Sequence, residues 1–290
     1  MLNIRKKLLI ILLIVLGIEL TFIGFQFLKP TQTTDVTKTS ASSRTSEKET
    51  ATTADSSETN ADPWIESSEE ISFPILMYHS LAESEGNSLK IPPAEFREHM
   101  QWLKEHDYYT LTPEEAYRVL TENKKPAEKI VWITFDDGYL NNYEDGFPIL
   151  KELDLNATIN YIVDRQGAST YIDVPQMKEM KDSGLVHIES HTMNHLEVDK
   201  LAEADLAYEL SESKAFFDNT LNQETLLLCY PAGRYNETSK TAAADAGYKM
   251  AVTTEPGYAR ASDGLFALKR VRISPGYDGE GFGQLITAYQ

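Results

Sequence analysis

The sequence predicts an α/β protein built on a mainly parallel sheet, which we expect to close into a complete or distorted (β/α) barrel. Strand-like and helix-like segments alternate over about 220 residues, the pattern of a parallel sheet covered by helices. Near the middle, an apolar run at 130–135 ends abruptly in two carboxylates and a glycine. Catalytic groups of barrel enzymes collect where strands end. An open doubly wound sheet is the alternative.

A hydrophobic run at residues 8–28 follows a basic cluster at residues 5–7. Its length fits a transmembrane helix of ~20 residues. The basic cluster predicts that residues 1–7 are cytoplasmic and that the rest of the chain is extracellular. Glu19 interrupts the run at a cost of roughly 2.5–3.5 kcal/mol, which the dense Leu, Ile and Val can offset. A cleaved signal peptide is the alternative, but no small-residue cleavage site follows, so we expect a single-pass anchor in the cell membrane.

Residues 29–70 are rich in Ser and Thr and contain few apolar side chains. Such a segment cannot bury enough surface to offset its ordering entropy, so we expect a disordered spacer. The folded domain is expected at 71–290. Its expected strands are 71–79, 130–135, 157–163, 186–189, 226–230, 248–253 and 267–273. Its expected helices are 93–106, 112–123, 143–153, 174–183, 201–219 and 237–246.

The charge balance is acidic, with 27 Lys and Arg against 45 Asp and Glu and a net charge of −18. This balance argues against nucleic acid or an anionic membrane surface as the main ligand, whereas a neutral or cationic polymer is tolerated. Cys229 is the single cysteine of the sequence, so no intrachain disulfide can form. We expect a monomer.

Two carboxylates and two histidines carry the chemical signal. Asp136 and Asp137 are adjacent, so they can share one site only where the strand gives way to a loop, a turn that Gly138 permits. His191 and His195 are four residues apart, which on a helical turn places both on one face at the spacing that a metal ion needs. Either feature alone could be an ordinary turn or a surface pair; together they favour a metal site.

Three motifs, in this order, make the chain similar to the polysaccharide deacetylase family (NodB homology domain, carbohydrate esterase family four). They are Thr-Phe-Asp-Asp-Gly-Tyr at 134–139, His-Thr-x-x-His at 191–195 and Tyr-Pro-Ala-Gly at 230–233. The segment Pro-Ile-Leu-Met-Tyr-His at 74–79 resembles the opening of the membrane-bound and exported branch. The resemblance covers residues 71–290 and implies a distorted (β/α) barrel.

The resemblance implies a role for each motif residue. Asp136 matches the general base, and Asp137, His191 and His195 match the ligands of a metal, usually zinc and sometimes cobalt. The backbone N–H of Ala232 matches the donor that stabilises the oxyanion. The implied reaction is metal-dependent removal of acetyl groups from N-acetylglucosamine-type residues of a cell-wall or cell-surface polysaccharide, with release of acetate, in a Gram-positive bacterium.

The sequence departs from the family pattern at two places. Many relatives carry an Arg where Cys229 stands, and a late His that protonates the leaving amine, whereas no His follows His195 here. His79 matches the acid that relatives with the Tyr-His opening can use. Arg270 or Arg272 could replace the missing Arg, and we favour Arg270.

Two other classes of protein compete with a deacetylase. A glycosidase also uses paired carboxylates, but they stand on separate elements roughly 5–9.5 Å apart and leave the His pair unexplained. A carbohydrate-binding protein of the same fold without activity is the stronger alternative, because the motif Arg and the late His are both missing. The polymer itself stays open between peptidoglycan, a poly-N-acetylglucosamine and a wall polysaccharide or its linkage unit.

Overall fold

The structure is a computed structural model that describes residues 63–289. The expected membrane anchor at 8–28 and most of the expected spacer lie outside these residues. Within the described range, no helix combines the length and the apolar character needed to cross a membrane.

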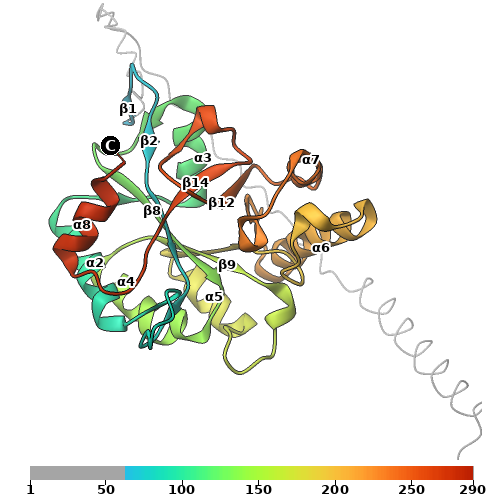
Figure 1. The fold of residues 1–290 in the computed structure, drawn as a ribbon, viewed down its shortest axis with the longest axis horizontal. Helices are drawn as coiled ribbons and strands as arrows, with labels where there is room; N and C mark the ends of the chain where they lie inside the picture. Colours follow the sequence, from blue (N-terminus) through green and yellow to red (C-terminus); the bar gives the residue numbers. More distant parts are fainter. Residues whose placement is uncertain (1–62, 290) are drawn as a thin grey trace, which may run out of the picture. The chain divides into compact units, whose positions relative to one another are not determined.

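Parallel strands form the centre of the domain (Figure 1). The main strands are β3 (Ile75–Tyr78), β6 (Tyr109–Thr110), β8 (Ile130–Asp137), β9 (Ala157–Tyr161), β10 (Val186–Ser190), β11 (Leu227–Cys229), β12 (Met250–Pro256) and β14 (Leu268–Arg272). They form one sheet in the order β3-β14-β12-β11-β10-β9-β8-β6, and β3 also pairs with β8. Because that pairing closes the sheet on itself, the expected barrel is confirmed and the open sheet is excluded.

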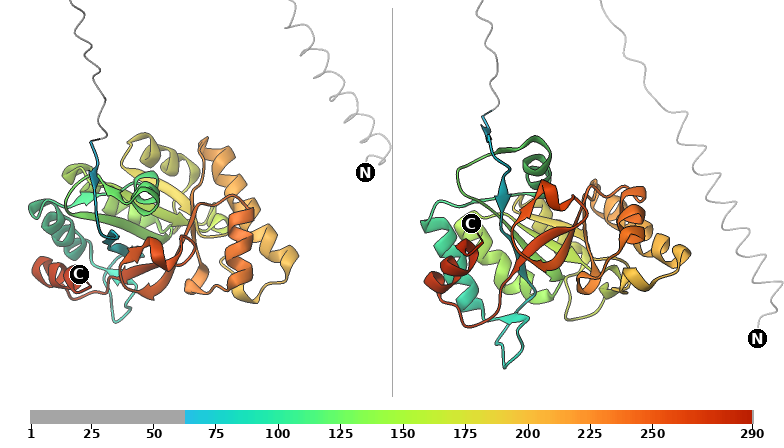
Figure 2. Two further views of the ribbon diagram at one scale, coloured as in Figure 1. Left: turned by 90° about the horizontal axis from the view of Figure 1, so that it is seen from above. Right: turned by 45° about the horizontal axis from the view of Figure 1, so that its top comes forward.

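Helices surround the strands (Figures 1 and 2). They are α2 (Pro93–Glu105), α3 (Pro113–Glu122), the π-helix η2 (Asn142–Gly146), α4 (Phe147–Leu153), α5 (Val174–Asp182), α6 (Glu203–Leu221), α7 (Glu237–Asp245) and α8 (Gly279–Thr287). Reciprocal hydrogen bonds between the side chain of each residue and the backbone N–H of the other join Thr112 and Glu115 in a capping box at the start of α3.

Helix α8 was not predicted, because its glycine-rich sequence has low helix propensity. Its stability comes from packing: Phe282 and Ile286 are fully buried, and α8 lies beside α2 (Figure 1). A Cβ at Gly283 would lie 2.3 Å from the Trp102 ring. The glycine that weakens the helix therefore permits its close contact with α2.

The folded part begins earlier than the sequence indicated. Strand β1 (Ile65–Glu66), within the expected spacer, pairs antiparallel with β7 (Lys124–Lys125). Glu70 accepts hydrogen bonds from the backbone N–H and the hydroxyl of Ser262. Both partners are remote in sequence, so the polar composition of this segment gave no sign of them. The remaining short pairs are β2 (Ser72–Phe73) with β13 (Ala259–Arg260) and β4 (Ser80–Leu81) with β5 (Lys90–Ile91).

Side chains of β8 alternate between two environments. Val131, Ile133 and Phe135 belong to the apolar cluster that includes the covering helices. Ile130 and Trp132 belong to a second cluster, which includes residues of β11, β12 and β14. Since alternate strand residues share a face, the Trp132 face continues through Thr134 to Asp136, inside the barrel at the C-terminal end of its strands.

Candidate active site

Strand β8 delivers two neighbouring carboxylates because its backbone turns at the second. Asp137 has a φ of 75° and Gly138 a φ of 82°. A Cβ at Gly138 would lie 2.1 Å from a ring carbon of Tyr161. A glycine is therefore required here both for the turn and for the close approach of the ring.

Asp137, His191 and His195 converge, with their ligand atoms all within 4.8 Å of one another. The Oδ1 atom of Asp137 lies 3.5 Å from His191 Nε2 and 3.8 Å from His195 Nε2. A tetrahedral ion with bonds of about 2.0–2.1 Å places its ligand atoms roughly 3.3 Å apart, so the three side chains fit a divalent metal. His191 Nδ1 bonds to the carbonyl of Cys229 at 2.8 Å, which makes Nδ1 the donor and leaves Nε2 available to an ion.

The two histidines lie on a loop, so the expected helical turn is wrong. Thr192 and His195 have positive φ values of 67° and 58°, a costly conformation for residues other than glycine. Hydrogen bonds within the loop and to helix α6 stabilise this conformation. Within the loop, His195 N donates to Thr192 Oγ1 at 3.1 Å. The buried Glu209 of α6 accepts from the backbone and side-chain nitrogens of Asn194 at 2.9 and 2.6 Å.

Asp136 is buried and paired with a buried arginine. Arg270 Nη1 donates to Asp136 Oδ1 at 2.8 Å and Nη2 donates to Oδ2 at 2.7 Å. Asn160 Nδ2 adds a third bond, at 2.8 Å to Oδ1. Burial alone would raise the pKa of Asp136, but the Arg270 guanidinium holds it well below its usual range. Asp136 therefore stays ionised at neutral pH.

Arg270 reaches the space beside Cys229, where many relatives carry an Arg. Its Nη2 lies 3.5 Å from the Cys229 sulfur and its Nε donates to the carbonyl of Thr253 at 2.7 Å. Arg272 is exposed instead. Cys229 also forms a close group with Asp136 and His191, but burial raises the pKa of its thiol. The protonated thiol makes this second group a poorer metal site than Asp137 with the two histidines.

His79 and Ala232 stand beside this centre. His79 Nε2 is 3.9 Å from Asp136 Oδ2, and its own carbonyl accepts from Asn142 at 2.8 Å. Burial lowers the pKa of His79, while the charges of Asp136 and Asp137 oppose that shift. Ala232 follows β11 with a φ of 53°, and its N–H has no acceptor among the described residues. That N–H is thus free to bind a substrate oxygen.

Several residues at the site were not found from the sequence. Asn160 and Glu209 act across long sequence separations, so no local pattern could identify them. Tyr139 directly follows the Asp-Asp-Gly motif, and this position in the sequence was the one indication that its side chain belongs to the site. Burial raises its pKa, and hydrogen bonds to Asp137 and Tyr171 raise it further. Tyr139 thus orients the carboxylate of Asp137, a candidate metal ligand.

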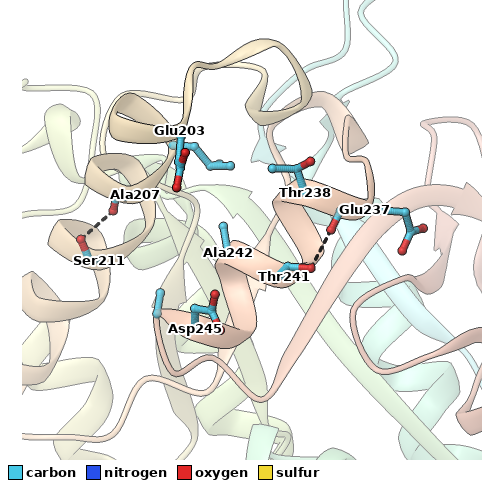
Figure 3. Close-up of a pocket in the computed structure, with 10 residues that line it drawn as sticks. Glu203, Ala207, Ser211, Glu237, Thr238, Thr241, Ala242 and Asp245 are labelled. Carbon is cyan, nitrogen blue, oxygen red and sulfur yellow. Dashed lines mark hydrogen bonds between the residues drawn. The ribbon is translucent and has the colours of Figure 1, made fainter.

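A groove of about 590 Å³ lies between α6 and α7 (Figure 3). Glu203 of α6 lies at one side, and Glu237 and Asp245 come from α7. None of its lining residues belongs to the centre described above.

Comparisons with known proteins agree on one family. The profile described as polysaccharide deacetylase matches residues 123–251. One relative is the YxkH protein of Bacillus subtilis (strain 168), which is provisionally named as a polysaccharide deacetylase. It is 48% identical to this chain over 80% of this chain and 82% of its own length. A Staphylococcus aureus poly-beta-1,6-N-acetyl-D-glucosamine N-deacetylase is 26% identical over 68% of this chain and 72% of its own.

Solved structures give the same result. The Streptococcus pyogenes deacetylase PplD, solved in complex with acetate, matches with a TM-score of 0.72 and 39% identity over 75% of this chain and 99% of its own. A polysaccharide deacetylase from Bacillus cereus matches with a TM-score of 0.68 and 30% identity over 75% of this chain and 69% of its own.

Proposed function

Because this chain belongs to the polysaccharide deacetylase family, we propose that it is a metal-dependent N-deacetylase. Its substrate would be an N-acetylglucosamine-type residue of a cell-surface polysaccharide, and acetate would be released. The observation that carries the proposal is the convergence of Asp137, His191 and His195 beside the ionised Asp136. The first three supply imidazole and carboxylate ligand atoms that lie close together. Both carboxylate oxygens of Asp136 instead accept hydrogen bonds from Arg270.

Asp137, His191 and His195 would hold zinc or cobalt. Such an ion lowers the pKa of a water towards ~7 and polarises the acetamide carbonyl. Asp136 would take a proton as the water oxygen attacks that carbonyl. Its bonds to Arg270 and Asn160 fix the carboxylate in place for this transfer.

The free N–H of Ala232 would donate to the oxygen of the tetrahedral intermediate. One such donor is worth about 3–4 kcal/mol in related acyl-transfer sites. Ala232 has a left-handed backbone with a φ of 53°, and no described residue accepts a hydrogen bond from its N–H. The contribution comes from the main chain, so the side chain of Ala232 has no part in it.

His79 would protonate the amine that leaves. Burial lowers the pKa of its ring and so favours the neutral form, and Asp136 Oδ2 lies 3.9 Å from its Nε2 atom. The proton that Asp136 takes can therefore pass to His79 and on to the amine nitrogen while the C–N bond breaks. The proton count balances: the amine gains the proton that the water lost.

The N-terminal anchor and the extracellular position of the domain are part of this proposal. They are supported by the hydrophobic run at 8–28 and the preceding basic cluster. The polymer would be peptidoglycan, a poly-N-acetylglucosamine or a wall polysaccharide.

The test is acetate release by the full-length protein from a neutral chitooligosaccharide, together with elemental analysis. We expect one divalent ion per wild-type chain and activity that depends on it. His191→Ala should lose both. An inactive carbohydrate-binding protein would bind the oligosaccharide without releasing acetate, and equal metal content in both proteins would refute the site.

A further inference from the structure

Arg165 lies at the rim of the site and has no role in the reaction above. It ends η3 (Val163–Arg165), the turn that follows β9. The first two residues of η3 donate backbone hydrogen bonds to the carbonyls of Thr192 and Met193, at 3.2 and 2.8 Å. Those carbonyls belong to the histidine loop, so the position of Arg165 is fixed relative to the metal ligands.

The guanidinium of Arg165 faces an aromatic pair. Its Cζ atom is 5.6 Å from the centroid of the Tyr171 ring, and Tyr171 stacks on Tyr139 with centroids 5.2 Å apart. Tyr139 directly follows the Asp-Asp-Gly turn at 136–138. The contact with Tyr171 and the stack on Tyr139 therefore connect the charged guanidinium of Arg165 to the strand end that carries Asp136 and Asp137.

This charge is poorly neutralised by the protein. Asp164 Oδ2 is 3.9 Å from Arg165 Nη1, and both side chains are exposed, at 62% and 39%. Arg165 Nε is buried and has no hydrogen-bond partner within residues 63–289. By contrast, Arg97 binds Glu152 at 2.8 Å. A guanidinium carries five donors in a fork that matches a carboxylate or a phosphate.

Two further arginines lie at the same end of the barrel. Arg272 is the last residue of β14, and Arg234 follows the turn after β11. Both are exposed. In parallel strands the C-terminal ends meet at one edge, so these cations lie at the mouth together with the carboxylates of Asp136 and Asp137. A hydrogen bond from Lys200 lowers the pKa of Glu197, and the charge of Arg234 also lowers it. Of the three arginines, Arg165 is the one that lies against the stacked Tyr171 and Tyr139 rings.

We propose that Arg165 binds an anionic group, a carboxylate or a phosphate, on the sugar next to the one that is deacetylated. The preferred substrate is then an anionic N-acetylated polysaccharide rather than a neutral one. The stacked Tyr139 and Tyr171 rings provide an apolar face for the sugar ring beside the guanidinium. This inference rests on the proposed function, because it concerns the substrate of the same site.

The test compares three substrates with the zinc-loaded full-length protein. They are a neutral chitooligosaccharide, an oligosaccharide with a free lactyl carboxylate on its muramic acid, and a chitooligosaccharide that carries a phosphate ester. The variants are Arg165→Gln, Arg165→Lys and, as a matched control, Arg97→Gln. The control removes the same charge from an ion pair between α2 and α4.

We expect Arg165→Gln to lower the ratio of kcat/KM on the anionic substrate to that on the neutral one about ten- to hundredfold, mainly through KM. Arg165→Lys should restore part of the ratio and Arg97→Gln should preserve it. The anionic substrate that loses more identifies carboxylate or phosphate as the recognised group. An unchanged ratio, or an equal fall in the control, overturns the inference alone. A wild-type protein that releases acetate from none of the three overturns the proposed function and this inference with it.

Discussion

Asp136 and Glu189 are buried carboxylates on the interior face of the same barrel, and they favour opposite protonation states. Each stands in register with Asn160 of β9. Arg270 holds the pKa of Asp136 well below its usual range. Burial raises the pKa of Glu189 to about 8. At Asp136 a full opposite charge outweighs the effect of burial on the pKa, whereas at Glu189 the two backbone hydrogen bonds offset that effect only in part.

The donors to Glu189 are dipoles without net charge. Leu226 N and Leu227 N donate to Glu189 Oε2 at 2.9 and 2.7 Å. They lie where β10 and β11 share a single register pair, Ser190 with Leu228. Glu189 therefore replaces missing backbone pairing and serves the fold. Asp136 has an arginine because the proposed reaction needs a carboxylate that is already ionised.

The largest expected effect comes from removing the charge of Asp136. Asp136→Asn should lower acetate release about 10⁴-fold, because the amide cannot accept the proton. The metal should remain, since Asp137, His191 and His195 are unchanged. Acetate release and elemental analysis measure the two properties separately, and Asp182→Asn on the exposed face of α5 is the matched control. Loss of metal together with activity would instead make Asp136 a ligand.

His79→Ala should have the next largest effect on activity. Acetate release should fall roughly 10²–10⁴-fold with normal metal content, because the leaving amine loses its proton donor. The pH dependence of kcat/KM provides a second measurement. Because the variant retains the Asp136–Arg270 pair, the acidic limb of this profile should stay at the wild-type pH. A variant with wild-type turnover would exclude His79 as the acid.

Arg270→Met should make Asp136 resemble Glu189. Without the guanidinium, burial raises the pKa of Asp136, so the acidic limb of the kcat/KM profile should move to higher pH. The protein should also lose about 3–5 kcal/mol of stability at neutral pH, because a charge is left unpaired in the interior.

Arg270→Lys is the matched control for that experiment. It keeps the charge but loses the two-point contact, so the limb should move less. Chemical denaturation and a pH–rate profile measure both effects. An acidic limb that stays in place in Arg270→Met would show that Arg270 does not set the pKa of Asp136.

The sequence predicted the barrel, and it selected three metal-ligand candidates that the fold brings close together, because both depend on local patterns. Alternating strands and helices predict a parallel sheet, and Asp137 with His191 and His195 occupies short motifs. Long-range partners were less accessible. The sequence favours Arg270 over Arg272 but does not decide between them, because the choice depends on which side of β14 faces the barrel.

Other features depend on tertiary contacts that no local pattern encodes. The spacing of His191 and His195 suggested a helix, whereas Glu209 and a left-handed backbone hold a loop. Helix α8 contradicts the low propensity of its glycines because α2 packs against it. The sequence predicts only that Glu189 ends a strand, whereas its bonds to Leu226 and Leu227 depend on the incomplete pairing of β10 with β11.

The smallest expected effect is on the Glu189 side of the comparison. Between the ordinary pKa near 4.5 and the folded value of about 8, the folded state keeps a proton that the unfolded state releases. Wild-type stability from this group should therefore be fully present below pH 4.5 and decline as the pH rises towards 8.

The Glu189→Gln variant has no titratable group at this position, yet its amide oxygen can still accept hydrogen bonds from the backbone N–H groups of Leu226 and Leu227. The variant should lose this part of the pH dependence and change activity little. Denaturation of both proteins at several pH values measures the difference, and parallel stability curves would show that Glu189 is already ionised in the folded protein.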